Sequence, residues 1–254
     1  MNDPSEESYF EQLIEELCSA NEEFKFIHDT LYNKSYRQAV LSPTEKFVAS
    51  FSKNGDSLSM WNYYSKGNGY NFGIDIQKIM DLNRSTDFSI QQVEINYDKV
   101  YQLEQLEELF FKHKEHAQFF NEELERLESD STEGVHDYFF SKTDGIQEKY
   151  IDDLEKLRIG FKHPAYAREE EVRLIISEAS GLKEGERVSF KISSSGVFVS
   201  YVCLSLKAPE CILDITTHPL NGELHKLGVE EFIRHDPKIR KIQIRASEIP
   251  FREV

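Results

Sequence analysis

The most informative part of the chain is residues 51–64, which read FSKNGDSLSMWNYY. They join the end of a predicted strand to a turn at Asn54-Gly55, because Asn and Gly tolerate the backbone conformations that tight turns need. The turn leads into a predicted helix that carries Trp61, the only tryptophan in the chain. Glycines beyond the helix bend the chain back into a second predicted strand, residues 70–76. A strand, a polar turn, an aromatic helix and a strand in this order are typical of the frame of a ligand site.

The composition limits the classes of protein to which this chain can belong. Its 254 residues are 39% hydrophobic and 12% aromatic, which is enough to build a core in one large domain or two small ones. The formal net charge of −16 argues against broad binding to a nucleic-acid backbone, which needs clustered Lys and Arg. No run of apolar residues approaches membrane-spanning length, and no segment resembles a signal peptide. We therefore expect a soluble, cytoplasmic protein.

The cysteines and histidines give no sign of a metal site. Cys18, Cys203 and Cys211 form no even set and have no metal-binding spacing, so we expect free thiols in a reducing cytosol. The eight histidines form no HxxxH or HExxH pattern. The sequence therefore predicts no metal.

The pattern of apolar residues predicts an α+β fold in a single domain, residues 1–254. Apolar side chains at helical spacing predict helices over residues 5–33, 99–129 and 145–157. Strands are predicted from β-branched and aromatic residues over 47–51, 70–76, 89–97 and several segments after residue 170. Because the two acidic helices stand between strands, we expect a helical insert at about 99–157 beside a mixed or antiparallel β core.

The sharpest chemical feature is the segment Glu169-Glu170-Glu171-Val172-Arg173. In a strand, side chains two residues apart share a face, so Glu169, Glu171 and Arg173 would lie opposite the apolar face. Two neighbouring carboxylates can divide a chemical task, one holding a substrate hydroxyl and the other orienting a nucleophile. The alternative is a solvated strand start whose Arg neutralises two Glu.

Basic and aromatic side chains precede that segment. Arg158 and Lys162 could bind a pyrophosphate, and Tyr166 could stack on a flat ring, although such a segment is more often a surface loop. Ser50 and Ser52, at the end of the first predicted strand, could hydrogen-bond a ligand, although serine near a turn is usually structural.

Together these segments resemble the bacterial family catalogued as domain of unknown function 2971. The resemblance covers nearly the whole chain apart from the acidic helices around 101–157. It rests on Asn2-Asp3-Pro4 with Glu6, Phe51-Ser52, Met60-Trp61-x-x-Tyr64, the strand from Gly69 to Asp75, Lys162, Tyr166, Glu169-x-Glu171-x-Arg173, and the C-terminal segment from Ile242 to Arg252.

The layout of that family looks like that of ADP-ribosyltransferases, which implies a β core of that type and NAD as a substrate. In such enzymes a Glu on a late strand hydrogen-bonds the nicotinamide ribose and stabilises positive charge in the transition state. The resemblance implies Glu171 as the catalytic carboxylate and Glu169 as its accessory. Ser50, Ser52 and Tyr64 would line the pocket, with Trp61 in its wall. Arg173 is a further candidate for binding NAD.

The same resemblance implies an opening strand with His-Tyr-Thr ahead of the Asn-Asp-Pro segment. Here Asn2 is the second residue of the sequence. We therefore expect either that the start of the chain was assigned too late or that this chain lacks the first motif.

Two kinds of function stay open at this point. The first is an ADP-ribosyltransferase-like toxin or phage-defence effector that modifies a protein or a nucleic acid. The second is a non-catalytic binding or sensor module that holds a protein partner with helices 101–157. A glycosidase is a third reading, but Arg173 beside the two carboxylates should keep both ionised, which suits a general acid poorly.

Overall fold

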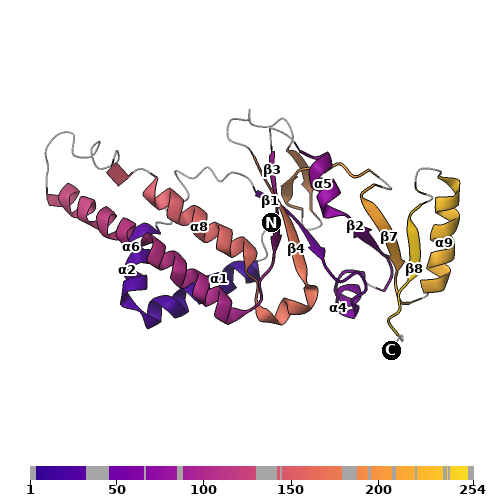
Figure 1. The fold of residues 1–254 in the computed structure, drawn as a ribbon, viewed down its shortest axis with the longest axis horizontal. Coiled ribbons are helices and arrows are strands. Elements are labelled where there is room, and N and C mark those ends of the chain that lie inside the picture. The colour runs from indigo at the N-terminus through magenta and orange to yellow at the C-terminus, as the bar shows by residue number, and fades with distance from the viewer. Residues whose placement is uncertain are drawn as a thin grey trace. The chain divides into compact units, whose positions relative to one another are not determined.

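The computed structural model describes residues 4–32, 46–65, 67–84, 88–129, 142–143, 145–178, 188–193, 196–207, 210–220, 222–236, 239 and 241–250. Within them the fold is α+β, with small antiparallel and mixed sheets, as the sequence predicts (Figure 1). The chain divides into two compact units. The first unit holds residues 1–44 and 94–167, and the second holds residues 45–93 and 168–254.

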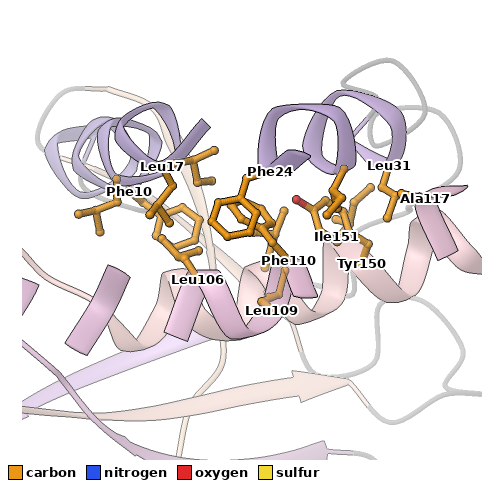
Figure 2. Close-up of a cluster of buried hydrophobic side chains, with 14 of the residues drawn as sticks. Phe10, Leu17, Phe24, Leu31, Leu106, Leu109, Phe110, Ala117, Tyr150 and Ile151 are labelled. Carbon is orange, nitrogen blue, oxygen red and sulfur yellow. The ribbon is translucent and has the colours of Figure 1, made fainter. Parts of the chain in front are cut away.

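The first unit is built from helices around one apolar core. They are α1 (Pro4–Ala20), α2 (Glu22–Leu31), α6 (Lys99–Ser129) and α8 (Ile146–Gly160). The acidic helices α6 and α8 share this core with the two N-terminal helices, because their apolar stripes face inward. Figure 2 shows the buried side chains that meet there, among them Phe10, Leu17, Phe24, Leu106, Phe110, Tyr150 and Ile151.

The predicted helix over residues 5–33 is wrong at one point, because the structure divides it at Asn21. This residue has an extended backbone, with φ −144° and ψ 111°, and its side chain accepts a hydrogen bond from the backbone N–H of Glu23. Asn at this position caps the new helix by satisfying a donor that has no partner within the helix. Apolar periodicity does not detect the break, since both helices bury the same kind of face.

Two polar pairs lie within the helical unit. Nδ1 of His28 lies 2.8 Å from the hydroxyl of Tyr150, which donates to it when the imidazole is neutral. Burial lowers the pKa of His28 to about 4. On the neighbouring helix pair, Nε2 of His113 lies 3.0 Å from Oδ2 of Asp153. Burial by itself would raise the pKa of Asp153, but hydrogen bonds from Lys112, His113 and Lys156 hold it well below its usual range.

The second unit contains two small sheets and a hairpin. In the first sheet the order is β1 (Lys46–Ser52), β4 (Glu171–Glu178), β3 (Phe88–Glu94), and β1 runs antiparallel to β4. In the second sheet the order is β2 (Tyr70–Ile74), β7 (Ile212–Thr217), β8 (Gln243–Ala246). Strands β7 and β8 are parallel, and helix α9 (Gly222–His235) connects them. The hairpin pairs β5 (Ser189–Ile192) with β6 (Phe198–Tyr201).

The predicted strand over residues 70–76 ends earlier, at Ile74. Asp75 caps helix α5 (Ile76–Leu82), since its side chain accepts a hydrogen bond from the backbone N–H of Lys78 at 3.1 Å. The sequence did not predict this helix. Its residue Ile79 packs in a small core with Leu174 of β4 and Cys211.

We expect the stability of the helical unit to decrease as the pH falls, because His28 is buried in its neutral form. The pKa of His28 is about 4 in the folded chain and 6.5 in a free imidazole, so its contribution is present in full above pH 6.5 and is lost as the pH falls towards 4. The difference corresponds to about 3 kcal/mol in the free energy of unfolding. Urea denaturation of wild type and His28→Phe between about pH 4.5 and 7 measures it.

The His28→Phe variant should show a shallower fall in stability across this pH range. Burial also lowers the pKa of His113, so part of the fall should persist. An unchanged slope in the variant would show that His28 does not titrate as described.

We also expect Gly73→Ala to destabilise the second unit. A Cβ at Gly73 would lie 2.6 Å from Oδ1 of Asp214 on the paired strand β7. The carboxylate would have to turn away from Arg245, which donates to it at 2.8 Å. Crowding of this kind costs about 1–3 kcal/mol of stability, measurable by urea denaturation. Gly228→Ala is the matched control: it lies in α9 with nothing within 4 Å, so it should stabilise the chain by up to about 1 kcal/mol.

Candidate functional site

Strand β4 is buried on both faces where the candidate carboxylates lie. All side chains from Glu171 to Ile176 are buried. The exposed fractions of Glu171 and Arg173 are 6% and 7%, and that of Glu169, just before the strand, is 8%. The strand start is therefore buried rather than solvated. Glu171 and Arg173 share a face of the strand as predicted, whereas Glu169 lies in the preceding 3-10 helix and not on the strand.

Glu171 and Arg173 form a bidentate ion pair. Nε of Arg173 donates to Oε1 of Glu171 at 2.8 Å, and a terminal nitrogen of the same guanidinium donates to Oε2 at 3.2 Å. Each charge compensates the other where water is excluded, and the two parallel bonds fix the plane of the carboxylate. The carboxylate is thereby held in one orientation.

The two serines of strand β1 lie directly across from this pair. In the antiparallel register Ser50 faces Arg173, and Ser52 faces Glu171. The hydroxyl of Ser52 also accepts a hydrogen bond from the backbone N–H of Asn54 at 3.1 Å, so it closes a local turn. The structure thus brings together four of the residues predicted for the site, and one of the serines has a structural role as well.

Glu170, between the two buried carboxylates, has an unusual backbone. Its φ is +46°, a left-handed conformation that costs a non-glycine residue about 1–3 kcal/mol. Two contacts hold it: the N–H of Lys53 donates to its carbonyl at 2.9 Å, and the side-chain amide of Asn54 donates to its carboxylate at 3.3 Å. The chain turns here from the 3-10 helix η2 (Pro164–Glu169) into β4. Backbone strain held in this way is typical of functional sites.

The turn at Asn54 connects this strained junction to the lone tryptophan through Asp56. The side-chain oxygen of Asn54 accepts from the N–H of Asp56 at 3.1 Å, and Oδ1 of Asp56 accepts from Nε1 of Trp61 at 2.7 Å. The hydroxyl of Ser247 donates to the same Oδ1 at 2.6 Å, and the N–H of Glu248 donates to Oδ2 at 2.9 Å. One carboxylate thus joins the turn, the tryptophan and the segment after β8.

The predicted aromatic helix is shorter and less regular than an ordinary helix. A turn of α-helix, α4 (Leu58–Met60), leads into a π-helical segment, η1 (Trp61–Ser65). Trp61 is 5% exposed, whereas Tyr64 is 67% exposed. Trp61 therefore lies in the interior, and Tyr64, which was predicted to line the pocket, lies at the surface.

His218, after the end of β7, is a neighbour of Trp61 that sequence reasoning did not single out. It is 1% exposed, and its ring meets the indole edge to face with centroids 5.2 Å apart. Its Nδ1 accepts a hydrogen bond from the N–H of Leu220 at 3.0 Å, and burial lowers its pKa. The only signal in the sequence is a histidine directly after a predicted strand, which is too common to identify a site.

The predicted pyrophosphate-binding side chains belong to the first unit and have partners there. Arg158 pairs with Glu155, with its Nε 2.9 Å from the carboxylate. Lys162 is 8% exposed, lies 3.3 Å from the carboxylate of Glu6, and stands over the ring of Tyr166 at 5.2 Å. Their role in binding a ligand stays a prediction.

Neither a metal-binding cluster nor a membrane-spanning helix occurs among the described residues. No group of three or more His, Cys, Asp or Glu side chains could hold a metal ion in the part of the chain that the structure describes. None of the described helices is long and apolar enough to cross a membrane.

The comparisons with known proteins support the family resemblance. The model of a family described as "Protein of unknown function (DUF2971)" matches residues 60–174, which include Trp61 and β4 as far as Leu174. The match runs through the acidic helices, which the resemblance had left out, and does not reach residues 2–6 or 242–252. Asn2, Asp3, Phe251 and Arg252 lie outside the described residues. No curated protein and no solved structure matches the chain.

We expect the buried pair to be strongly coupled in a double-mutant cycle. Glu171→Leu and Arg173→Met each leave a buried charge without its bidentate partner, at a cost of about 3–5 kcal/mol. The double variant should lose less than the sum of the two, because no uncompensated charge of the pair remains. Urea denaturation of the four proteins gives the coupling energy, and additive losses would contradict the pairing.

Proposed function

We propose that this chain is an ADP-ribosyltransferase-like enzyme that uses NAD as its substrate, with Glu171 as the catalytic carboxylate. The observation that carries the proposal is the buried, oriented Glu171 directly across from Ser52 on the neighbouring strand. The resemblance described above predicts a serine strand and a late glutamate strand, and their pairing supports that layout. Glu169, buried just before β4, is its proposed accessory.

The proposed role of Glu171 follows from the charge that develops during transfer. When the bond between ribose C1′ and the nicotinamide nitrogen breaks, the electron pair leaves with nicotinamide and the ribose acquires positive charge. A fixed carboxylate that accepts a hydrogen bond from a ribose hydroxyl stabilises this charge. The nucleophilic atom of the acceptor then bonds C1′ and releases its proton to solvent.

The ion pair with Arg173 is compatible with this role. The guanidinium fork donates one hydrogen bond to each oxygen of the Glu171 carboxylate, and a carboxylate oxygen can accept more than one hydrogen bond. Arg173 acts as a positioning residue, since its two parallel hydrogen bonds fix the plane of the carboxylate.

The other residues of the proposed site have supporting parts. Ser50 and Ser52 would line the nicotinamide pocket beside Trp61, and Tyr64 would meet the ligand from the surface. Arg158, Lys162 and Tyr166 remain the proposed groups for the pyrophosphate and a flat ring. The acceptor, a protein or a nucleic acid, is open.

Loss of NAD in the presence of the purified full chain tests the proposal. We expect Glu171→Gln to lower the rate by about 100-fold or more, the usual effect of removing a group that stabilises transition-state charge. Glu223→Gln is the matched control, because it removes the same charge from an exposed glutamate on α9 that is not among the residues proposed for the site, and it should keep near-wild-type turnover. Circular dichroism checks that each variant is folded.

Two outcomes would decide against the proposal. Equal NAD turnover by wild type and Glu171→Gln would remove Glu171 from the mechanism. No turnover by wild type, with or without added protein and nucleic-acid acceptors, would favour the alternative of a non-catalytic binding module. If Glu171→Gln does not fold, Glu171→Asp keeps the charge while withdrawing the carboxylate by one methylene, and it should fold and lose rate.

A further inference from the structure

Helix α6 carries an exposed face that no described residue of the chain covers. Three exposed glutamates lie along this face: Glu104, Glu115 and Glu122. Glu115 and Glu122 follow Glu104 by 11 and 18 residues, so all three project from the helix in the same direction to within about 20°. They form one row along the helix. Exposed apolar side chains flank this row on both sides: Val100 (65% exposed) and Phe111 (56%) on one, Tyr101 (44%) and Phe119 (37%) on the other.

The carboxylates of this row are not neutralised within the described structure. Each Lys and Arg of α6 pairs with another carboxylate instead: Lys99 with Glu16, Lys112 with Asp153, Lys114 with Glu23, and Arg126 with Glu123. No cation lies within ion-pair distance of Glu104, Glu115 or Glu122 among the residues that the structure describes. Three of these four cations therefore pair with other helices of the first unit, and the outer row is left negative.

Neither half of this face is explained by stability. Like charges three or four residues apart destabilise a helix, and Glu104 is followed by Glu107 and Glu108 at those spacings. The exposed parts of the flanking Val, Tyr and Phe side chains gain nothing from burial while they face water. An uncompensated acidic row between two apolar edges is instead complementary to a ligand that brings positive charge and apolar groups together.

We propose that the outer face of α6, residues 100–122, binds a basic amphipathic helix of a partner protein. A row of Lys or Arg on such a helix would face the three glutamates, and its flanking apolar residues would cover Val100 with Phe111 and Tyr101 with Phe119. At 1.5 Å per residue the face is about 33 Å long, which suits a partner helix of about six turns. This inference does not depend on the NAD chemistry proposed above.

The charge of the face excludes the other common occupants. Nucleic acid and anionic membrane surfaces carry the same sign as the glutamate row and would be repelled. A second copy of this chain, with a net charge of −16, would bring the same acidic row to a symmetric contact. A basic protein segment is the partner class that removes the repulsion.

Fluorescence anisotropy tests the proposal with the full chain and a labelled synthetic helix. The probe carries Lys in one row, flanked by Leu, and a scrambled peptide of equal composition has no such row. Wild type should bind the probe, and Glu104→Gln/Glu115→Gln/Glu122→Gln should bind it about tenfold more weakly, since three exposed ion pairs are lost. Val100→Ser/Phe111→Ser should also weaken binding.

The matched control is Glu7→Gln/Glu11→Gln/Glu15→Gln on α1. It removes the same charge from three exposed glutamates in a helical row that has no exposed apolar edges, so it should change affinity less than twofold. Equal weakening by both triple variants, or equal affinity for the scrambled peptide, would overturn the proposal. Failure of wild type to bind the probe would overturn it too, as would binding of a DNA duplex or anionic vesicles that depends on the α6 row.

A second measurement separates lost binding from lost folding. Because the three carboxylates are exposed and no described cation lies within ion-pair distance of them, the α6 triple variant should unfold at nearly the same temperature as wild type. Weaker binding by an equally stable protein identifies a binding surface, whereas a clearly lower unfolding temperature would show that the row serves the fold and would contradict the proposal.

Discussion

The buried ion pair between Glu171 and Arg173 is the interaction on which the candidate site depends. Two charges two residues apart on a strand must share a face, and a buried face admits them only as partners. Their fork geometry orients the carboxylate without any ligand. The strained turn at Glu170 immediately precedes the pair, and contacts from Lys53 and Asn54 hold it. The side chain proposed for catalysis is thus set in place before a substrate arrives.

The two compact units rely on different kinds of interaction. In the first, long amphipathic helices bury an extended apolar core, and its ion pairs add to a fold that burial already stabilises. In the second, the sheets have small apolar cores, such as the one around Ile215, Ile233 and Ile242. Specific hydrogen bonds therefore contribute more to holding its segments in place. Asp56 is an example, because its one carboxylate joins a turn, the indole of Trp61 and the segment after β8.

The proposed functions use these differences. The second unit offers a buried, oriented carboxylate, which suits the proposed chemistry on a developing cation. The first offers an outer helix face whose charges are left unbalanced because its cations are engaged elsewhere on the bundle. The proposed catalytic role and the proposed partner-binding role therefore use residues of different units.

Local pattern determined much of the fold from the sequence alone. The 31-residue acidic helix α6 follows from apolar residues at helical spacing, and the shared face of Glu171 and Arg173 follows from the two-residue period of a strand. Such features depend only on neighbours along the chain. The break at Asn21 and the start of α5 at Asp75 were missed because both depend on one capping side chain.

Only the tertiary structure decided which of the candidate residues meet. Pairing of β1 with β4 put Ser50 and Ser52 opposite Arg173 and Glu171, although more than 100 residues separate the strands. It also made Asp56 a junction and put His218 against Trp61, contacts without a local signature. The sequence by itself therefore determined the periodic elements and the charge pattern. Burial, register and the partners of each polar group required the folded chain, because they depend on residues that are close in space and distant in sequence.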